Sequence, residues 1–134
     1  MAADDRVERA LAVQKSIFGV EVKSGRRANE PEAAEDLSRL MLEHAFADVW
    51  SRPGLDTRTR SFITLSMAIA QDSTRELRNH TWGALRLGIT PEEIIEVIIH
   101  AAVYCGVAKA SGAWSEVRRI LAEHAAAASA GEAQ

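Results

Sequence analysis

The sequence of 134 residues predicts an all-α protein, a compact bundle of about six helices. Apolar residues recur with the helical period along most of the chain, and no segment alternates apolar and polar residues as a half-buried strand would. Prolines, glycines and N-capping residues cut the periodic stretches into pieces of ordinary helix length. Nearly half of the residues are apolar. We therefore expect one domain over residues 1–134, with an ordered core from about residue 6 to 124.

The first two predicted helices flank a polar connection. Residues 19–30 are rich in charge and glycine and should form a surface loop. The second helix should begin at Pro31 and stop at Arg52-Pro53-Gly54, because proline cannot continue the hydrogen-bond ladder. The residues expected to face inward are Val7, Ala10, Leu11, Gln14 and Phe18 in the first helix, and Leu37, Leu40, Met41, Ala45 and Val49 in the second.

The third and fourth predicted helices each follow a start signal. Asp56 is the expected N-cap of a third helix that is apolar nearly all round and should be buried. After a break at Gln71-Asp72, Ser73 and Glu76 have the spacing of a capping box, in which a hydroxyl and a carboxylate satisfy backbone N–H groups reciprocally. The fourth helix should run from there to Gly88, a residue that suits the C′ position.

The fifth and sixth predicted helices complete the bundle. Thr90-Pro91-Glu92-Glu93 is a second capping box with proline at the first helical position. The fifth helix should then run from residue 94 to about 105, apolar on most sides, and Gly106 should end or kink it. The sixth should start near Ser111, and the tail after His124 should fray. Its inward-facing residues are expected to be Trp114, Val117 and Leu121.

Two helices that are apolar on most faces are many for so small a domain. Either the other four helices wrap them, or several subunits share the burial. We favour partner subunits.

The bulk composition excludes several classes of protein. The net charge is −3 and no basic stripe is present, so nucleic acid is not an expected partner. No run approaches the roughly 18 apolar residues of a membrane span, and the polar N-terminus lacks the pattern of a secretory signal. The single cysteine, Cys105, excludes an internal disulfide and a multi-cysteine metal site. We expect a cytoplasmic protein without a metal site, since His44 and His124 belong to no constellation of ligands.

Two pairs of residues with helical spacing are the first candidates for chemistry. Glu76 and His80 are four apart, so the carboxylate can orient the imidazole, raise its pKa and form an acid/base unit. The alternative is a capping-box acid beside a solvated histidine. His100 and Tyr104 repeat the spacing in an apolar stretch. They either line a pocket or form a hydrogen-bonded core pair.

Two further residues have possible roles in binding. Arg60 borders the apolar run of the third helix, so its guanidinium could face a cavity and hold a substrate carboxylate through paired hydrogen bonds. A lone arginine is otherwise a solvated side chain. Trp50 is either a core residue or a ligand contact.

Five segments resemble, in order and spacing, the motifs of gamma-carboxymuconolactone decarboxylases over about residues 6–124. These segments are Asp48-Val49-Trp50-Ser51-Arg52-Pro53-Gly54-Leu55, Arg60-Ser61-Phe62-Ile63-Thr64, Glu76-Leu77-Arg78-Asn79-His80, Gly88-Ile89-Thr90 with Glu92-Glu93-Ile94, and Tyr104-Cys105-Gly106-Val107. The same superfamily contains alkylhydroperoxidase-like proteins with a Cys-x-x-Cys-x-x-x-His motif. Its cysteine positions fall at Ser73 and Glu76, and its histidine falls at His80. The chain therefore resembles the non-redox branch.

The resemblance implies an alkylhydroperoxidase-like fold with intertwined subunits, as a trimer or hexamer. It implies a cofactor-free carboxy-lyase of protocatechuate breakdown in the beta-ketoadipate pathway, which turns gamma-carboxymuconolactone into 3-oxoadipate enol-lactone and CO2. We expect His80, held by Glu76, to donate a proton or to stabilise the oxyanion. Arg60 should anchor a carboxylate, and Trp50, His100 and Tyr104 should shape the pocket.

The chain departs from the family pattern at Arg86-Leu87 and at Ala108 to Ser111, where the family often has a polar pair and a proline and an asparagine. An enzyme of the same fold that acts on another carboxylated or lactone-like metabolite is therefore an alternative. A thiol-dependent peroxidase is disfavoured by the single cysteine. A non-catalytic oligomeric binding protein is a third possibility.

Overall fold

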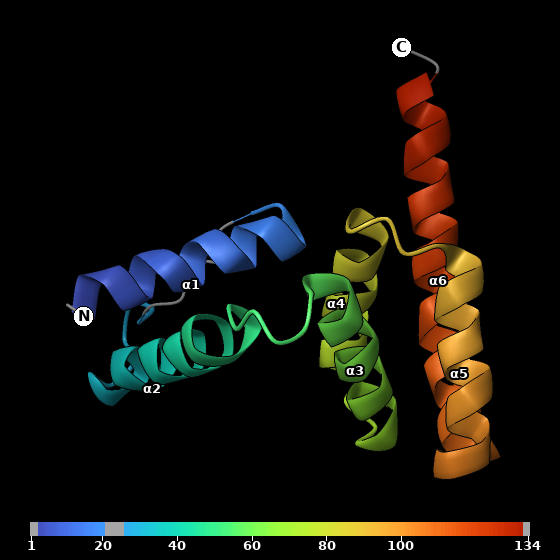
Figure 1. Ribbon diagram of the computed structural model, residues 1–134, viewed down its shortest axis with the longest axis horizontal. Helices are drawn as coiled ribbons and strands as arrows, with labels where there is room; N and C mark the ends of the chain where they lie inside the picture. The colour runs from blue at the N-terminus through green and yellow to red at the C-terminus, as the bar shows by residue number, and fades with distance from the viewer. Residues whose placement is uncertain (1–2, 21–25, 133–134) are drawn as a thin grey trace. The chain divides into compact units, whose positions relative to one another are not determined.

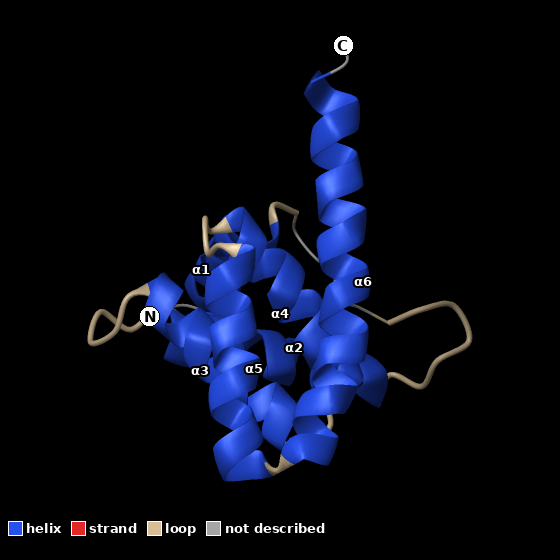
Figure 2. Ribbon diagram, turned by 90° about the vertical axis from the view of Figure 1, so that its right-hand side faces the viewer, coloured by secondary structure: helices blue, strands red, loops and turns tan. Residues whose placement is uncertain are grey.

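The computed structural model of the chain describes residues 3–20 and 26–132. Within these ranges the chain forms six α-helices and one π-helical segment, η1, without any strand (Figure 2). The all-α prediction and the predicted number of helices are thus confirmed. In chain order the elements are α1 (Ala3–Phe18), α2 (Ala33–Leu42), η1 (Glu43–Trp50), α3 (Thr57–Ala70), α4 (Thr74–Arg86), α5 (Pro91–Cys105) and α6 (Val107–Glu132) (Figure 1).

The contacts between residues divide the chain into two units, Met1–Thr57 and Arg58–Gln134, each compact in itself. A single domain over residues 1–134 therefore stays a prediction. Residues 21–25 of the predicted polar loop lie outside the described residues. None of the described helices is both long and apolar enough to cross a membrane.

In the first unit, α1 packs against η1, and α2 continues without a break into η1. The small apolar core consists of Ala10, Leu42 and Ala47, with Val7, Leu11 and Phe46 packed around it. The predicted inward face of α1 is confirmed at Ala10 and Gln14, which are buried. The π-helical segment ends with the Ser51 N–H bonded to the Phe46 carbonyl, two residues before Pro53, as the proline predicts.

The predicted apolar stripe of the second helix is wrong for the chain by itself. Leu40 is 66 % exposed, and Leu37, Met41 and Val49 are exposed as well. The buried positions are Leu42, Glu43 and Ala47. The π-helical turn changes the angular register after Leu42, so a regular 3.6-residue stripe does not continue to Val49. Leu37, Leu40 and Met41 precede this turn and lie on a face of α2 that this chain leaves uncovered.

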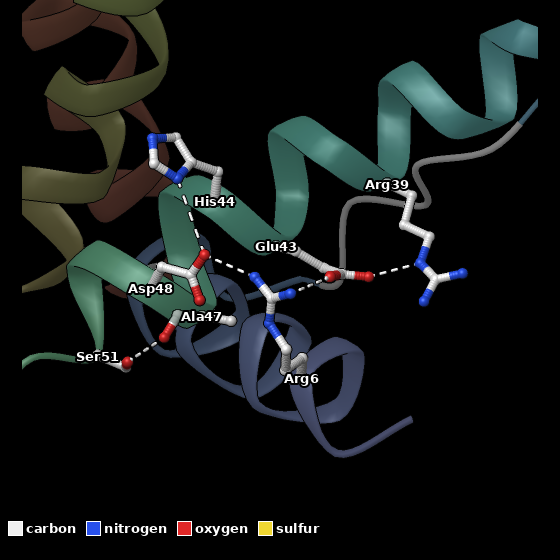
Figure 3. A network of polar contacts seen from close by, with 7 residues as sticks. All are labelled: Arg6, Arg39, Glu43, His44, Ala47, Asp48 and Ser51. Atoms are coloured by element: carbon white, nitrogen blue, oxygen red, sulfur yellow. Dashed lines mark hydrogen bonds and ion pairs between the residues drawn. The ribbon is translucent and has the colours of Figure 1, made fainter. Parts of the chain in front are cut away.

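A polar network fastens α1 to η1 (Figure 3). Glu43 is only 8 % exposed, and its carboxylate pairs with Arg6 at 3.1 Å and with Arg39 at 2.5 Å. Arg6 also reaches Asp48 at 2.6 Å, and Asp48 lies 3.8 Å from the imidazole of His44. Two guanidinium groups thus compensate the buried carboxylate. His44 thus belongs to the polar network between α1 and η1.

In the second unit, α6 packs against both α4 and α5, and residues of α3 complete the same core. The core members are Leu65, Ala68, Ile69, Leu77, Ala84, Leu85, Ile89, Ile94, Ile98, Ala101, Ala110, Ala113, Val117 and Ile120. Within this single chain the third helix, which is expected to be buried, is covered only in part, and so is the fifth. Met67 on α3 is 58 % exposed, and Ile99 and Val103 on α5 are exposed. The remaining helices of the unit cover only one side of each.

The two predicted capping boxes have different outcomes. At α5 the Thr90 hydroxyl accepts the Glu93 N–H at 3.2 Å, and the Glu93 carboxylate accepts the Thr90 N–H at 2.9 Å, which confirms the prediction. At α4 the Ser73 side chain makes no capping bond, so that prediction is wrong. The backbone explains the difference, since Thr90 is extended (φ −77°, ψ 155°) whereas Ser73 has ψ 82° after a tight turn at Asp72 (φ 51°).

The helix ends that depend on glycine follow the sequence prediction, and the bounds of α6 do not. Gly88 and Gly106 have φ of 83° and 93°, as helix-terminating glycines often do. However, α6 begins directly after Gly106 rather than near Ser111, and it stays helical to Glu132 beyond the predicted fraying point. Its buried face includes Val117 as predicted, but Trp114 is exposed.

Candidate active site

Helix α4 places Glu76 and His80 side by side within the second unit. The His80 Nε2 atom lies 3.7 Å from a Glu76 carboxylate oxygen. His80 is only 5 % exposed, whereas the Glu76 side chain is about half exposed. Because Ser73 makes no capping bond, no capping box ties Glu76 to the start of the helix. The carboxylate is therefore placed to orient the imidazole.

Burial reverses the expected direction of the His80 shift. Loss of hydration lowers the pKa of His80 below its ordinary value of 6.5, and the nearby Glu76 carboxylate opposes this only in part. The sequence-based expectation of a raised pKa is thus wrong. At neutral pH the imidazole is uncharged, with one N–H donor and one acceptor nitrogen.

A separate open pocket of about 790 Å³ lies between α3 and α5. Phe62 and Ser66 line it from α3, and the α5 residues that line it are Glu93, Glu96, Val97, Ile99, His100, Ala101, Tyr104 and Cys105. The rings of His100 and Tyr104 lie 5.0 Å apart at this wall. Tyr104 is 78 % exposed and His100 is also exposed, so the interpretation as a core pair is wrong.

An ion pair adjoins the pocket at the beginning of α5. The Arg58 guanidinium bonds to Glu93, and it lies over the Phe62 ring at 5.4 Å from the centroid. The backbone N–H of Thr90, followed by the contact with Arg58, lowers the pKa of the Glu93 carboxyl below its ordinary value. The sequence interpretation missed Arg58, Phe62, Ser66 and Glu96. The spacing of Glu93, Val97, His100 and Tyr104 along one face of α5 is the signal that could have found this wall.

The sequence-predicted site residues do not all meet. His100 and Tyr104 line the pocket, whereas Arg60 and His80 are not among its lining residues. Trp50 belongs to the first unit, where its ring stacks on Phe46 at 6.4 Å. The second unit thus contains the Glu76–His80 pair on α4, of which only the imidazole is buried, and an open pocket between α3 and α5.

Lys109 and Cys105 are the two further residues that could add chemistry near the pocket. Lys109, at a departure from the family pattern, donates to the Ala70 carbonyl and to Asp72, both at 2.8 Å, and so binds the end of α3. Cys105 lines the pocket as a free thiol. Across residues 3–20 and 26–132, no three His, Cys, Asp or Glu side chains gather as metal ligands would.

Comparison with known proteins identifies the family of the chain. The model of the carboxymuconolactone decarboxylase family matches residues 35–119. The chain is 39 % identical over 110 residues to the nitrosuccinic acid decarboxylase of Metarhizium robertsii, covering 78 % of this chain and 77 % of the relative. It is 29 % identical over 113 residues to the 4-carboxymuconolactone decarboxylase of Acinetobacter baylyi, covering 84 % of each. These matches confirm the predicted class of enzyme, a carboxy-lyase. The chain belongs to the carboxymuconolactone decarboxylase family.

Proposed function

We propose that this chain removes CO2 from a small polycarboxylic acid that carries its own electron-withdrawing group. The observation that carries the proposal is the buried His80 with Glu76 at 3.7 Å, in a chain of a decarboxylase family. Nitrosuccinic acid and carboxymuconolactone, the compounds for which the two relatives are named, share one property. In each, the electron pair left by CO2 can move onto oxygen, of a nitro group or of an unsaturated lactone. The substrate thus supplies its own electron sink, and the proposed reaction needs no organic cofactor.

His80 has two tasks in this reaction. As the carbon–carbon bond breaks, its N–H donates a hydrogen bond to the oxygen that gains charge. The second task is proton transfer: with substrate bound, the imidazole takes a proton from solvent, gives it to the carbon that lost CO2 and returns to its neutral form. The resting imidazole is neutral because burial lowers the pKa of His80, and an arriving anion raises that pKa again. Glu76 stabilises the imidazolium formed in this way, so the pair becomes a proton donor only with substrate bound.

We place a nitro acid ahead of a lactone as the substrate. The nitrosuccinic acid decarboxylase shares 39 % identity with this chain, against 29 % for the lactone enzyme. The departures from the family pattern at Arg86-Leu87 and at residues 108–111 point the same way, since they separate this chain from the lactone decarboxylases. The second candidate substrate is carboxymuconolactone, which the sequence motifs predict together with a place in the beta-ketoadipate pathway.

The remaining site assignments are part of the same proposal. Trp50, Arg60, His100 and Tyr104 are proposed substrate contacts, His100 and Tyr104 supported by their place at the pocket. We also propose a homo-oligomer in the cytoplasm. Exposed apolar side chains on several helices support shared burial between copies, among them Leu37, Leu40, Met41, Val103 and Val107.

The test is CO2 release by the purified protein from nitrosuccinate and from carboxymuconolactone. We expect turnover of at least one, faster for the nitro acid, and loss of turnover in His80→Ala and Glu76→Gln with the oligomer intact. Full turnover in both variants would remove the pair from the mechanism. If neither compound loses CO2, the proposed substrate class is wrong.

A further inference from the structure

Arg58 is a cation that adjoins the α3–α5 pocket without being one of its lining residues. It bonds to Glu93 and lies over the Phe62 ring, and both of these residues line the pocket. Its side chain is 43 % exposed, so a ligand can reach it from solvent. The ion pair with Glu93 is made by one nitrogen, Nη2. A guanidinium has five N–H donors, which leaves donors for a second acceptor.

The charges around the pocket show why such a cation matters. Glu93 and Glu96 both line the cavity, and their charge would repel an anionic ligand. Several other cations of the second unit have different partners. Lys109 contacts Asp72, Arg119 contacts Glu116, and Arg118 lies over the Trp114 ring. Arg58 is therefore well placed to offset the repulsion.

We propose that Arg58 binds a carboxylate of the ligand in the α3–α5 pocket, with Glu93 and the Phe62 ring as positioning groups. The inference rests on the proposed function in one respect, that the ligand is a small polycarboxylic acid. Glu93 and Phe62 hold the planar guanidinium at the rim before the ligand arrives, which lowers the entropic cost of a bidentate contact. His100 lies seven residues after Glu93 on α5. At the helical rise of 1.5 Å per residue, this is about 10 Å along the helix axis. A ligand held by Arg58 would extend along α5 toward the His100–Tyr104 rings.

Arg58 and Arg60 lie on different faces of α3. Two residues along an α-helix correspond to a rotation of about 200°, so the two side chains leave α3 in nearly opposite directions. Neither arginine is among the lining residues of the pocket, but Arg58 contacts two of them, Glu93 and Phe62. The carboxylate contact in this pocket is thus assigned to Arg58, which the sequence motifs did not single out.

Binding of succinate, a diacid without an electron sink, tests the inference without turnover. Titration calorimetry on the full chain should show succinate binding that weakens about 10- to 100-fold in Arg58→Gln, the loss of one charge-assisted contact. Arg58→Lys should keep part of the affinity, since it keeps the charge but not the planar fork. Arg118→Gln, which removes a cation outside the pocket, should bind as the unaltered protein does. Succinamide, the uncharged analogue, should bind far more weakly.

Three results would overturn the inference: no succinate binding by the unaltered protein, equal affinity in folded Arg58→Gln, or loss of affinity in Arg60→Gln alone. Circular dichroism of each variant establishes folding, and Arg58→Lys decides the matter if the glutamine variant does not fold. Arg58-dependent succinate binding without any decarboxylation would contradict the proposed function and leave the Arg58 site intact. If Arg58→Gln decarboxylates as fast as the unaltered protein and binds succinate equally well, the Arg58 site is contradicted and the proposed function stands.

Discussion

Helices α4 and α5 carry the same two signals in their sequences and use them differently. Each begins with a hydroxyl residue three before a glutamate, and each contains a histidine in a pair four residues apart. The cap forms on α5 and not on α4. The histidine is buried on α4, at 5 % exposure, and open to solvent on α5. Spacing therefore determines which side chains are neighbours, whereas the packing of the helix determines what chemistry the neighbours have.

The largest expected difference between the two helices is catalytic. We expect His80→Gln to lower kcat by about 100- to 10,000-fold, the usual range for loss of a general acid/base group. We expect His100→Gln to raise KM with a smaller effect on kcat, because His100 lines an open pocket. Steady-state rates of CO2 release measure both. A larger loss of kcat in His100→Gln than in His80→Gln would place the chemistry on α5.

The caps give the next difference, in stability. We expect Thr90→Ala to lower the free energy of unfolding by about 1 kcal/mol, since it removes a formed cap, and Ser73→Ala to leave it nearly unchanged. Urea unfolding followed by circular dichroism measures both values. Equal losses would mean that Ser73 caps α4 in solution.

The same comparison shows which features the sequence could predict. Gly88 and Gly106 ended their helices as expected, and Thr90 with Pro91 started α5, because each signal acts within one turn of the chain. The neighbourhood of Glu76 and His80 was also predictable from helical geometry. The direction of the His80 pKa was not, because desolvation comes from residues far along the chain. Arg58 was missed for the same reason, since its partner Glu93 is 35 residues away.

Burial of His80 should appear in the dependence of stability on pH. The folded pKa of His80 lies below 6.5, so between that value and 6.5 the unfolded state binds more protons than the folded state. Stability should therefore fall as the pH drops below about 6.5. We expect His80→Gln to flatten this slope between pH 5 and 7. Thermal unfolding at a series of pH values measures the slopes, and an equal slope in His80→Gln would show that another group is responsible.

The smallest expected effect is the acid sensitivity of the α5 cap. The Thr90 N–H and Arg58 lower the pKa of Glu93 below 4.5, so its contribution to stability is complete above that pH. It should be lost as the pH falls through the folded value. Glutamine also fits a capping box, so Glu93→Gln should keep the cap and remove the titration. We expect this variant to lose less stability than the unaltered protein between pH 4.5 and 3. A Glu93→Gln profile that departs from the unaltered one only near pH 6 would contradict this assignment.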